Sequence, residues 1–193
     1  MLEQIKKEAL EEHIPILMDD TLEEIAKYLN KIKPTAILEI GTAVGYSAIC
    51  FSKYLNENGY IDTIELDEQR ASKAIDNINK MELNSKINVM IGNAVDILPT
   101  LNKKYDVVFI DAAKGKYPIF LEHALRLTKQ NGYIFADNIL YKGYVMSDYN
   151  KHKQRTAVTH LREYIKLITE NENLETKILE VGDGLAISKL IKI

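Results

Sequence analysis

The stretch "TKILEVGDGLAISKLI", residues 176–191, decides the fold expected for this chain. It contains two β-rich runs that are joined through Gly182, Asp183 and Gly184. An Asp-Gly pair between such runs is a strong signal of a β-hairpin. The last two strands should therefore be antiparallel, and the preceding sequence determines what kind of sheet they close.

Strand-like and helix-like segments alternate through the rest of the chain. The strands are expected at 36–40, 60–66, 87–92, 107–110 and 133–137. The helices are expected at about 21–32, 46–57 and 68–81, around "DILPTL", from Pro118 to Asn131-Gly132, and at about 152–170. Thr21 and Glu24 have capping-box spacing at the start of the first helix, which Pro34 stops. This alternation predicts a parallel sheet with helices on both faces, closed by the antiparallel hairpin.

The composition suits one domain over residues 1–193, because 46% of the residues are hydrophobic and 27% are charged. A net charge of −3 argues against a protein that coats nucleic acid with its whole surface. The single Cys50 and four scattered histidines predict neither a disulfide framework nor a zinc site. No apolar run could span a bilayer, and "MLEQIKKEALEEH" is too charged for a signal peptide, so a cytoplasmic location and no membrane partner are expected.

Each strand of the parallel set ends in small or oxygen-bearing residues. In an open parallel sheet, ligands bind beyond the carboxyl ends of the strands. Polar residues that merely make the end of a strand soluble would explain any one of these positions. They explain all five together poorly. The sequence therefore predicts a binding site formed by the strand ends, which are Glu39 with Gly41, Glu65, Gly92-Asn93-Ala94, Asp111, and Asp137-Asn138.

The first two strand ends indicate a nucleoside ligand. In "EIGTAVG", Gly41 and Gly45 would let the backbone approach a ligand closely, but Ala43 stands where a dinucleotide site would have its middle glycine. Glu65 lies 20 residues after Gly45 and is placed to accept hydrogen bonds from ribose hydroxyls. Together with Glu39 before the loop, this pattern fits S-adenosylmethionine better than a nicotinamide dinucleotide.

The later strand ends indicate a metal. Asp111, Asp137 and Asn138 would supply three hard oxygen ligands from neighbouring strands, which suits Mg²⁺. Lys114 follows within one short turn and could deprotonate or polarise a substrate hydroxyl. From the sequence alone, Lys114 could equally be a solvated loop lysine.

At these residues the chain resembles the cation-dependent O-methyltransferases, the group of the catechol and caffeoyl-CoA O-methyltransferases. The resemblance runs from about Ile14 to Lys189, through the motifs "ILEIGTAVGYS", "IEL", "FIDAAKGKY", "ADN" and "VGDGLAIS". Within the group, "DNILYKGYV" and the basic stretch that follows look most like the bacterial tRNA 5-hydroxyuridine methyltransferases. The resemblance implies a seven-stranded, Rossmann-like class I methyltransferase fold and a homodimer.

The resemblance also implies roles for single residues. Glu65 would hold the ribose of S-adenosylmethionine, and Ser47 and the loop from Gly41 to Gly45 would hold its methionine end. Ala94 would border the adenine, and Met18 would lie against the cofactor. Glu39 and Asp111 are also expected among the residues that bind the cofactor. Mg²⁺ would be bound by Asp111, Asp137 and Asn138, with Lys114 as the catalytic lysine. Ala43 and a shorter N-terminus depart from the family pattern.

The metal site would serve two classes of substrate, because catechol and 5-hydroxyuridine both offer two neighbouring oxygens. The segment 141–155 has a net charge of +3, because it contains four basic residues and one acidic residue, Asp148. Three tyrosines are interleaved with the basic residues, which are Lys142, Lys151, Lys153 and Arg155. Phosphate contacts and stacking platforms suit a tRNA anticodon loop, although such a charge run is often a solvated surface.

The sequence thus predicts methylation of 5-hydroxyuridine at the tRNA wobble position to 5-methoxyuridine. A small-molecule O-methyltransferase of the catechol or caffeoyl-CoA type is the alternative. A nicotinamide-dependent oxidoreductase is disfavoured by the missing middle glycine. A non-catalytic S-adenosylmethionine-binding module is disfavoured because the candidate metal ligands and Lys114 are all present.

Overall fold

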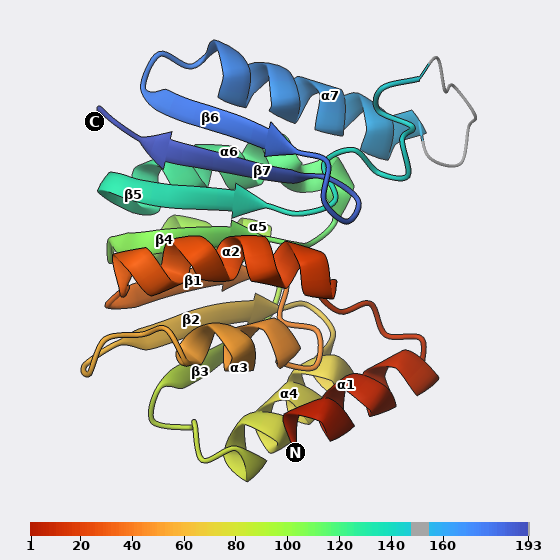
Figure 1. The fold of residues 1–193 in the computed structure, drawn as a ribbon, viewed down its shortest axis with the longest axis vertical. Helices are drawn as coiled ribbons and strands as arrows, with labels where there is room; N and C mark the ends of the chain where they lie inside the picture. Colours follow the sequence, from red (N-terminus) through yellow and green to blue (C-terminus); the bar gives the residue numbers. More distant parts are fainter. Residues whose placement is uncertain (148–154, 193) are drawn as a thin grey trace. The chain divides into compact units, whose positions relative to one another are not determined.

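The computed structural model describes residues 1–147 and 155–192. The chain forms two compact units, Met1–Thr100 and Leu101–Ile193, which are drawn in Figure 1. The strands form a seven-stranded sheet in the order β3-β2-β1-β4-β5-β7-β6. This confirms the predicted class of a mostly parallel sheet with antiparallel C-terminal strands. The single domain stays a prediction.

The first unit contains three parallel strands and the helices that connect them (Figure 1). Its elements are α1 (Leu2–Glu11), α2 (Asp19–Ile32), β1 (Ala36–Ile40), α3 (Tyr46–Ser52), β2 (Tyr60–Glu65), α4 (Glu68–Lys80), β3 (Ile87–Ile91), α5 (Ala94–Ile97) and the 3₁₀ helix η1 (Leu98–Thr100). Every residue of β1 is buried, including the charged Glu39, and the other four residues of the strand are apolar. The strand β1 pairs with β2 from Ala36↔Tyr60 to Ile40↔Ile64, so the polar residues after both strands lie at the same edge.

The N-terminal part of this unit differs from the expectation in two ways. The helix α1 was not predicted, because only Ile5 and Ala9 of its residues are buried and its apolar stripe is narrow. The helix α2 begins at Asp19, so the predicted capping box is wrong. Thr21 is fully buried within the first turn, and Asp19 forms an ion pair with Lys6 of α1. The helix thus begins two residues before the predicted start, with Asp19 and Asp20 as acids in its first turn.

The helix α3 is shorter than predicted, since it ends at Ser52 rather than near residue 57. The chain then turns, with Tyr54 N donating to Phe51 O and Asn56 N donating to Pro34 O. Gly59 completes the turn, and a Cβ there would lie 2.7 Å from Leu55 Cβ. The turn therefore begins within the segment that the sequence predicts as a helix up to about Glu57.

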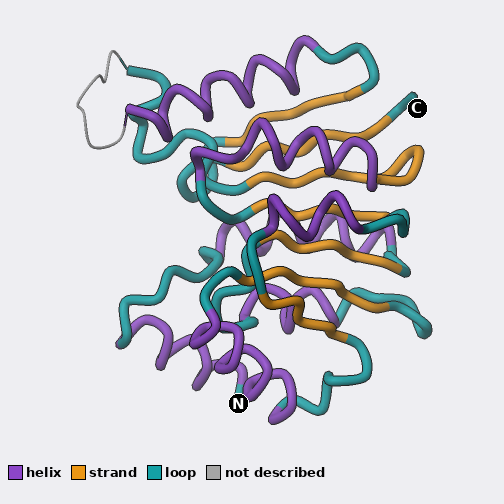
Figure 2. The backbone as a smooth tube through the Cα atoms, turned by 180° about the vertical axis from the view of Figure 1, so that it is seen from behind, coloured by secondary structure: helices purple, strands orange, loops and turns teal. Residues whose placement is uncertain are grey.

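The second unit contains two parallel strands followed by the antiparallel pair. Its elements are β4 (Tyr105–Ile110), the 3₁₀ helix η2 (Lys114–Lys116), α6 (Tyr117–Leu127), β5 (Thr128–Ala136), α7 (Arg155–Glu170), β6 (Leu174–Leu179) and β7 (Leu185–Leu190). Figure 2 draws all strands in orange. The helix α7 packs against η2, α6 and β6. No helix among the described residues of either unit is long and apolar enough to cross a membrane.

The prediction that Asn131-Gly132 ends a helix is wrong. The helix α6 ends at Leu127, and the strand β5 begins at Thr128, whose hydroxyl donates to Ala124 O. Asn131 has a φ of +64° and lies in the part of β5 where the pairing with β4 shifts register. The Asn-Gly pair therefore forms an irregularity inside a longer strand.

The C-terminal hairpin is confirmed, and its turn is bonded to the segment that follows Asp137-Asn138. Gly184 O accepts a hydrogen bond from Ile139 N at 3.0 Å. Asp183 O accepts from Leu140 N at 2.9 Å and from Tyr141 N at 3.2 Å. The motif "VGDG" thus fixes the backbone next to two candidate metal ligands.

Gly184 leaves no room for a side chain at this contact, so we expect Gly184→Ala to destabilise the protein. Its φ is +94°, and a Cβ would lie 2.4 Å from Leu140 Cγ. Gly143→Ala is the matched control, because Gly143 has a φ of +75° with nothing within 4 Å of its Cβ position. The overlap should lower the free energy of unfolding by about 1–3 kcal/mol more than in the control. Equal urea denaturation midpoints for the two variants would contradict the packing role.

Candidate active site

The loop between β1 and α3 needs left-handed backbone at three positions. The φ angles are +103° at Gly41, +47° at Ala43 and +82° at Gly45. Gly45 also lies close to α4, because a Cβ there would be 3.4 Å from Ala74 Cβ. The glycines are therefore needed for the backbone conformation, since a Cβ at Gly45 would make only an ordinary contact, and Ala43 adopts a conformation that glycine takes more easily.

Glu39 is fully buried beneath this loop and is bonded to two hydroxyls. Its Oε1 accepts from Ser47 Oγ at 2.6 Å, and its Oε2 accepts from Thr63 Oγ1 at 2.5 Å. Thr42 Oγ1 lies 2.6 Å from Thr63 Oγ1. The predicted cofactor residues Glu39 and Ser47 are thus hydrogen-bonded to each other. Through its hydrogen bonds, Glu39 stabilises the loop that lies over it.

Glu65 ends β2 and faces the same loop. Its Oε2 accepts a hydrogen bond from Ala43 N at 2.7 Å, and its Oε1 accepts from Asp67 N at 3.0 Å. The carboxylate is therefore held in one orientation, and each oxygen keeps a second lone pair. Glu65 is placed so that it can accept further hydrogen bonds from a ligand at the loop.

The two remaining cofactor candidates of this unit lie at helix starts. Ala94 is buried at the first position of α5, where Asn93 Oδ1 accepts from Val95 N. Gly92 N donates to Glu65 O at 2.8 Å, which places this turn beside the end of β2. Met18 precedes α2 and is 51% exposed, and no described contact connects it with the loop.

The candidate metal ligands of the second unit form one cluster around an ammonium group. Lys114 Nζ lies 2.9 Å from Asp111 Oδ1 and 2.7 Å from Asn138 Oδ1. Asp137 Oδ1 accepts from Asn138 N at 2.7 Å, and Asn138 has a φ of +56°, so the chain turns sharply between the two side chains. The side chains predicted for the metal site are therefore close in space.

Lys114 is not a solvated loop lysine in this structure. Its side chain is only 16% exposed, and its ammonium also donates to Tyr117 Oη at 2.9 Å. Burial lowers the pKa of Lys114, but Tyr117 and Asp111 outweigh burial and raise the pKa above its ordinary value. The side chain is therefore a cation at neutral pH, and it would need a changed environment to act as a base.

Asp137 is the most buried of the ligand candidates, with 2% of its surface exposed. Burial first, and then the charge of Asp111, raise the pKa of Asp137 to about 7. A carboxyl with this pKa is poised to lose its proton when a cation binds. The nearby Lys114 ammonium only partly offsets the effects of burial and of Asp111 on this carboxyl.

Tyr117 also belongs to this cluster, although it is not among the residues predicted for the site. It is fully buried, and its hydroxyl donates to the main-chain oxygen of Asp137 at 2.8 Å. Burial raises the pKa of Tyr117, so the phenol stays protonated. A buried tyrosine hydroxyl usually has a hydrogen-bond partner, and Tyr117 stands only three residues after Lys114, so this spacing is the signal that could have identified it.

Part of the predicted RNA-binding segment 141–155, residues 148–154, lies outside the described residues. Lys151 and Lys153 belong to 148–154, whereas Lys142 and Arg155 are described and exposed. Arg155 is the first residue of α7. The basic segment therefore stays a prediction.

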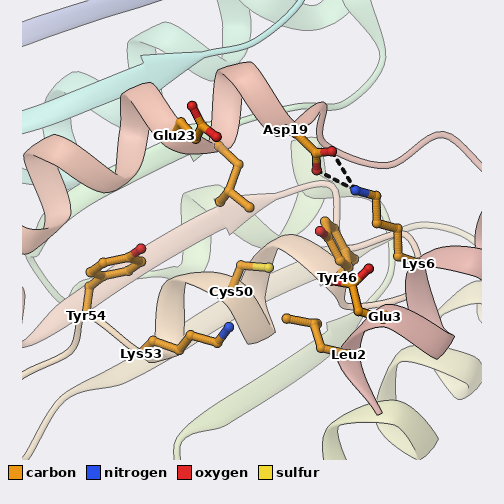
Figure 3. A pocket seen from close by; sticks show the side chains of 10 residues that line it. Leu2, Glu3, Lys6, Asp19, Glu23, Tyr46, Cys50, Lys53 and Tyr54 are labelled. Carbon is orange, nitrogen blue, oxygen red and sulfur yellow. Dashed lines mark hydrogen bonds and ion pairs between the residues drawn. The ribbon is translucent and has the colours of Figure 1, made fainter.

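A cavity of about 450 Å³ lies between α1, α2 and α3, and Figure 3 shows its lining. Lys6 pairs with Asp19 at its edge, at 2.5 Å. Cys50 faces the cavity, but burial raises the pKa of its thiol to about 11, so it is a poor nucleophile at neutral pH. None of the predicted cofactor, metal or catalytic residues lines this cavity.

The fold and these strand-end residues define a methyltransferase-like α/β protein, and comparison with known proteins gives its family. Residues 1–191 match the family model described as "O-methyltransferase", so the chain belongs to the O-methyltransferase family. The chain is 35% identical over 161 residues to catechol O-methyltransferase from Niastella koreensis, covering 79% of this chain and 72% of that protein. It is 27% identical over 175 residues to caffeoyl-CoA O-methyltransferase from Stellaria longipes, covering 84% of this chain and 71% of that protein.

A solved structure gives the same result. The O-methyltransferase from Bacillus cereus in complex with SAH superposes with a TM-score of 0.89 at 26% identity, covering 98% of this chain and 90% of that one. The prediction of an S-adenosylmethionine-dependent O-methyltransferase is thus confirmed at the level of the family. The reported relatives carry names from the catechol and caffeoyl-CoA groups, which support the alternative substrate class better than tRNA.

Proposed function

We propose that this protein methylates one of two neighbouring hydroxyl oxygens on a small catechol-like substrate, using S-adenosylmethionine and Mg²⁺. The observation that carries the proposal is the cluster in which Asp111 and Asn138 contact the Lys114 ammonium and Asp137 lies next to Asn138. The names of the relatives support the small-molecule substrate. The homodimer and the cytoplasmic location stay predictions.

The residues of the cluster fit a divalent cation. Two carboxylates and an amide oxygen are the donor types that Mg²⁺ prefers. Among the described residues, no group of three or more His, Cys, Asp or Glu side chains is placed to hold a metal, so Asn138 would have to complete the set. Asp111 Oδ1 and Asn138 Oδ1 already surround a positive charge, that of Lys114.

Asp111, Asp137 and Asn138 would bind the cation and orient the two substrate oxygens. When bound, the cation would supply a Lewis acid that makes a substrate hydroxyl more acidic. Lys114 would share Asp111 and Asn138 with the cation and would lie near a second positive charge, and both changes lower its pKa. Lys114 could then accept the proton of the hydroxyl, while orientation of the substrate lowers the barrier further.

Glu65 and the β1–α3 loop would bind S-adenosylmethionine. Glu65 would accept hydrogen bonds from the ribose hydroxyls, while Ala43 N keeps its carboxylate in place. Gly41, Gly45 and Ser47 would hold the methionine end, and Ala94 would border the adenine. The roles of Met18, Glu39 and Asp111 toward the cofactor are likewise part of this proposal.

We expect Glu65→Ala to weaken S-adenosylmethionine binding by about tenfold or more, because a hydrogen bond to a charged group contributes about 1.5–3 kcal/mol. Glu68→Ala is the matched control, since Glu68 is an exposed acid in the first turn of α4. Titration calorimetry on the folded variants measures the difference. Equal affinities for the two variants would remove Glu65 from the cofactor site.

The substrate class can be tested by methyl transfer from labelled S-adenosylmethionine. Catechol and caffeoyl-CoA would be compared with tRNA that contains 5-hydroxyuridine, at equal enzyme concentrations. The proposal predicts transfer to a small molecule with neighbouring hydroxyls. Transfer to the tRNA with none to the small molecules would overturn it in favour of 5-methoxyuridine formation.

A further inference from the structure

Tyr117 joins two parts of the candidate metal site through a single oxygen atom. The residue is 0% exposed at the start of α6. Its hydroxyl donates to Asp137 O at 2.8 Å and accepts from Lys114 Nζ at 2.9 Å. The same atom therefore contacts the candidate catalytic lysine and the peptide between the side chains of Asp137 and Asn138.

Tyr117 also differs from the other two oxygen partners of Lys114. Asp111 and Asn138 are candidate metal ligands, so a bound cation would compete with the ammonium for both. The Tyr117 hydroxyl donates to Asp137 O at 2.8 Å, with Ile110 O as a more distant acceptor at 3.4 Å, and it accepts from Lys114 Nζ. It is the partner that Lys114 can keep when a metal binds.

The ring of Tyr117 is itself fixed in place. Tyr164 of α7 packs edge-on against it, with ring centroids 5.4 Å apart and an interplanar angle of 77°. Lys114 Nζ lies 5.1 Å from the centroid of the Tyr117 ring, which adds a cation–π contact. The ring contact with α7 therefore helps to fix the position of the Tyr117 hydroxyl.

We propose that Tyr117 is a positioning residue that holds Lys114 beside the metal ligands and fixes the main chain of Asp137. The inference rests on the proposed function, because it assumes that this cluster binds the metal and that Lys114 acts on the substrate. Groups that orient metal ligands typically contribute about 10- to 100-fold to metal affinity or activity.

Tyr117→Phe tests this role, and Tyr164→Phe is the matched control. Both tyrosines are fully buried in the same ring contact, but the Tyr164 hydroxyl has no hydrogen-bond partner among the described residues. We expect Tyr117→Phe to lower kcat by about 10- to 100-fold and to weaken Mg²⁺ binding in calorimetry. The KM for S-adenosylmethionine should stay unchanged, and Tyr164→Phe should match the parent in all three measurements.

The outcomes separate the inference from the proposed function. A parent enzyme that is fully active in EDTA would overturn the proposed metal site, and this inference with it. A metal-dependent parent with Tyr117→Phe equal to Tyr164→Phe in kcat and Mg²⁺ affinity would overturn the inference alone. A fall in kcat matched by an equal rise in the KM for S-adenosylmethionine would also overturn it, since general loosening would explain that pattern.

The parent protein supplies a second measurement in case Tyr117→Phe does not fold. A crystal structure with Mg²⁺ bound should retain the Tyr117 hydroxyl within hydrogen-bonding distance of Lys114 Nζ and Asp137 O. A hydroxyl that has left either atom in the metal-bound protein would overturn the positioning role.

Discussion

Asp111→Asn is expected to lower kcat by about a thousandfold or more while the protein stays folded. Metal-ion catalysis contributes several kcal/mol to the stabilisation of developing charge, and the substitution removes one of two carboxylates from the site. It also removes the anionic partner of Lys114, whose ammonium lies 2.9 Å from Asp111 Oδ1. The affinity for Mg²⁺, measured by calorimetry, should fall together with kcat.

Asp106→Asn is the control for this substitution. Asp106 lies on the same strand β4 and is also paired with a lysine, Lys129, at 2.8 Å. The control therefore makes the same chemical change and also breaks an ion pair, but away from the cluster. Comparable kcat values for Asp111→Asn and Asp106→Asn would contradict the metal-ligand role.

Lys114→Met is expected to lower kcat by about 10²- to 10⁴-fold, the usual contribution of a general acid or base. The methionine side chain keeps most of the aliphatic stem but removes the ammonium and its three oxygen contacts. Lys116→Met is the control, because Lys116 is exposed on the same 3₁₀ turn η2. Steady-state kinetics at saturating Mg²⁺ and S-adenosylmethionine measures the effect.

The pH dependence of Lys114→Met decides which role the lysine has. The raised pKa of Lys114 means that it begins as a cation, so it needs the bound metal before it can accept a proton. If the metal alone makes the hydroxyl acidic enough, the loss should be small and a higher pH should restore most of the rate. That result would contradict a catalytic base and would leave Lys114 as a group that orients the ligands.

The carboxyl ends of the strands could be predicted well from the sequence, because apolar runs and terminal acids are local signals, whereas the start of β5 at Thr128 was not predicted. The range 36–40 agrees with β1, and the cluster of Asp111, Asp137 and Asn138 follows from the parallel arrangement. Helix boundaries were less predictable. The helix α2 begins with Met18 rather than Thr21 as its N-cap, and α6 ends at Leu127, where the Thr128 hydroxyl donates to Ala124 O.

The contacts that support the site could not be predicted, because they join residues far apart in the chain. Tyr117 reads as an apolar residue before Pro118, yet its partner is the carbonyl of Asp137, 20 positions away. Gly184 reads as a hairpin glycine, yet it also has to leave space for Leu140. The spacing of residues in the sequence can identify candidate ligands. The residues that hold those ligands in place can be identified only from the contacts in the folded structure.

The central claim is that methyl transfer by this protein depends on a divalent cation held by Asp111, Asp137 and Asn138. The most direct measurement is transfer of labelled methyl from S-adenosylmethionine to catechol, before and after EDTA treatment and after Mg²⁺ is restored. We expect EDTA to abolish transfer and Mg²⁺ to restore it in the parent enzyme, whereas Asp111→Asn should stay inactive throughout. Unchanged transfer by the parent in EDTA would contradict the claim.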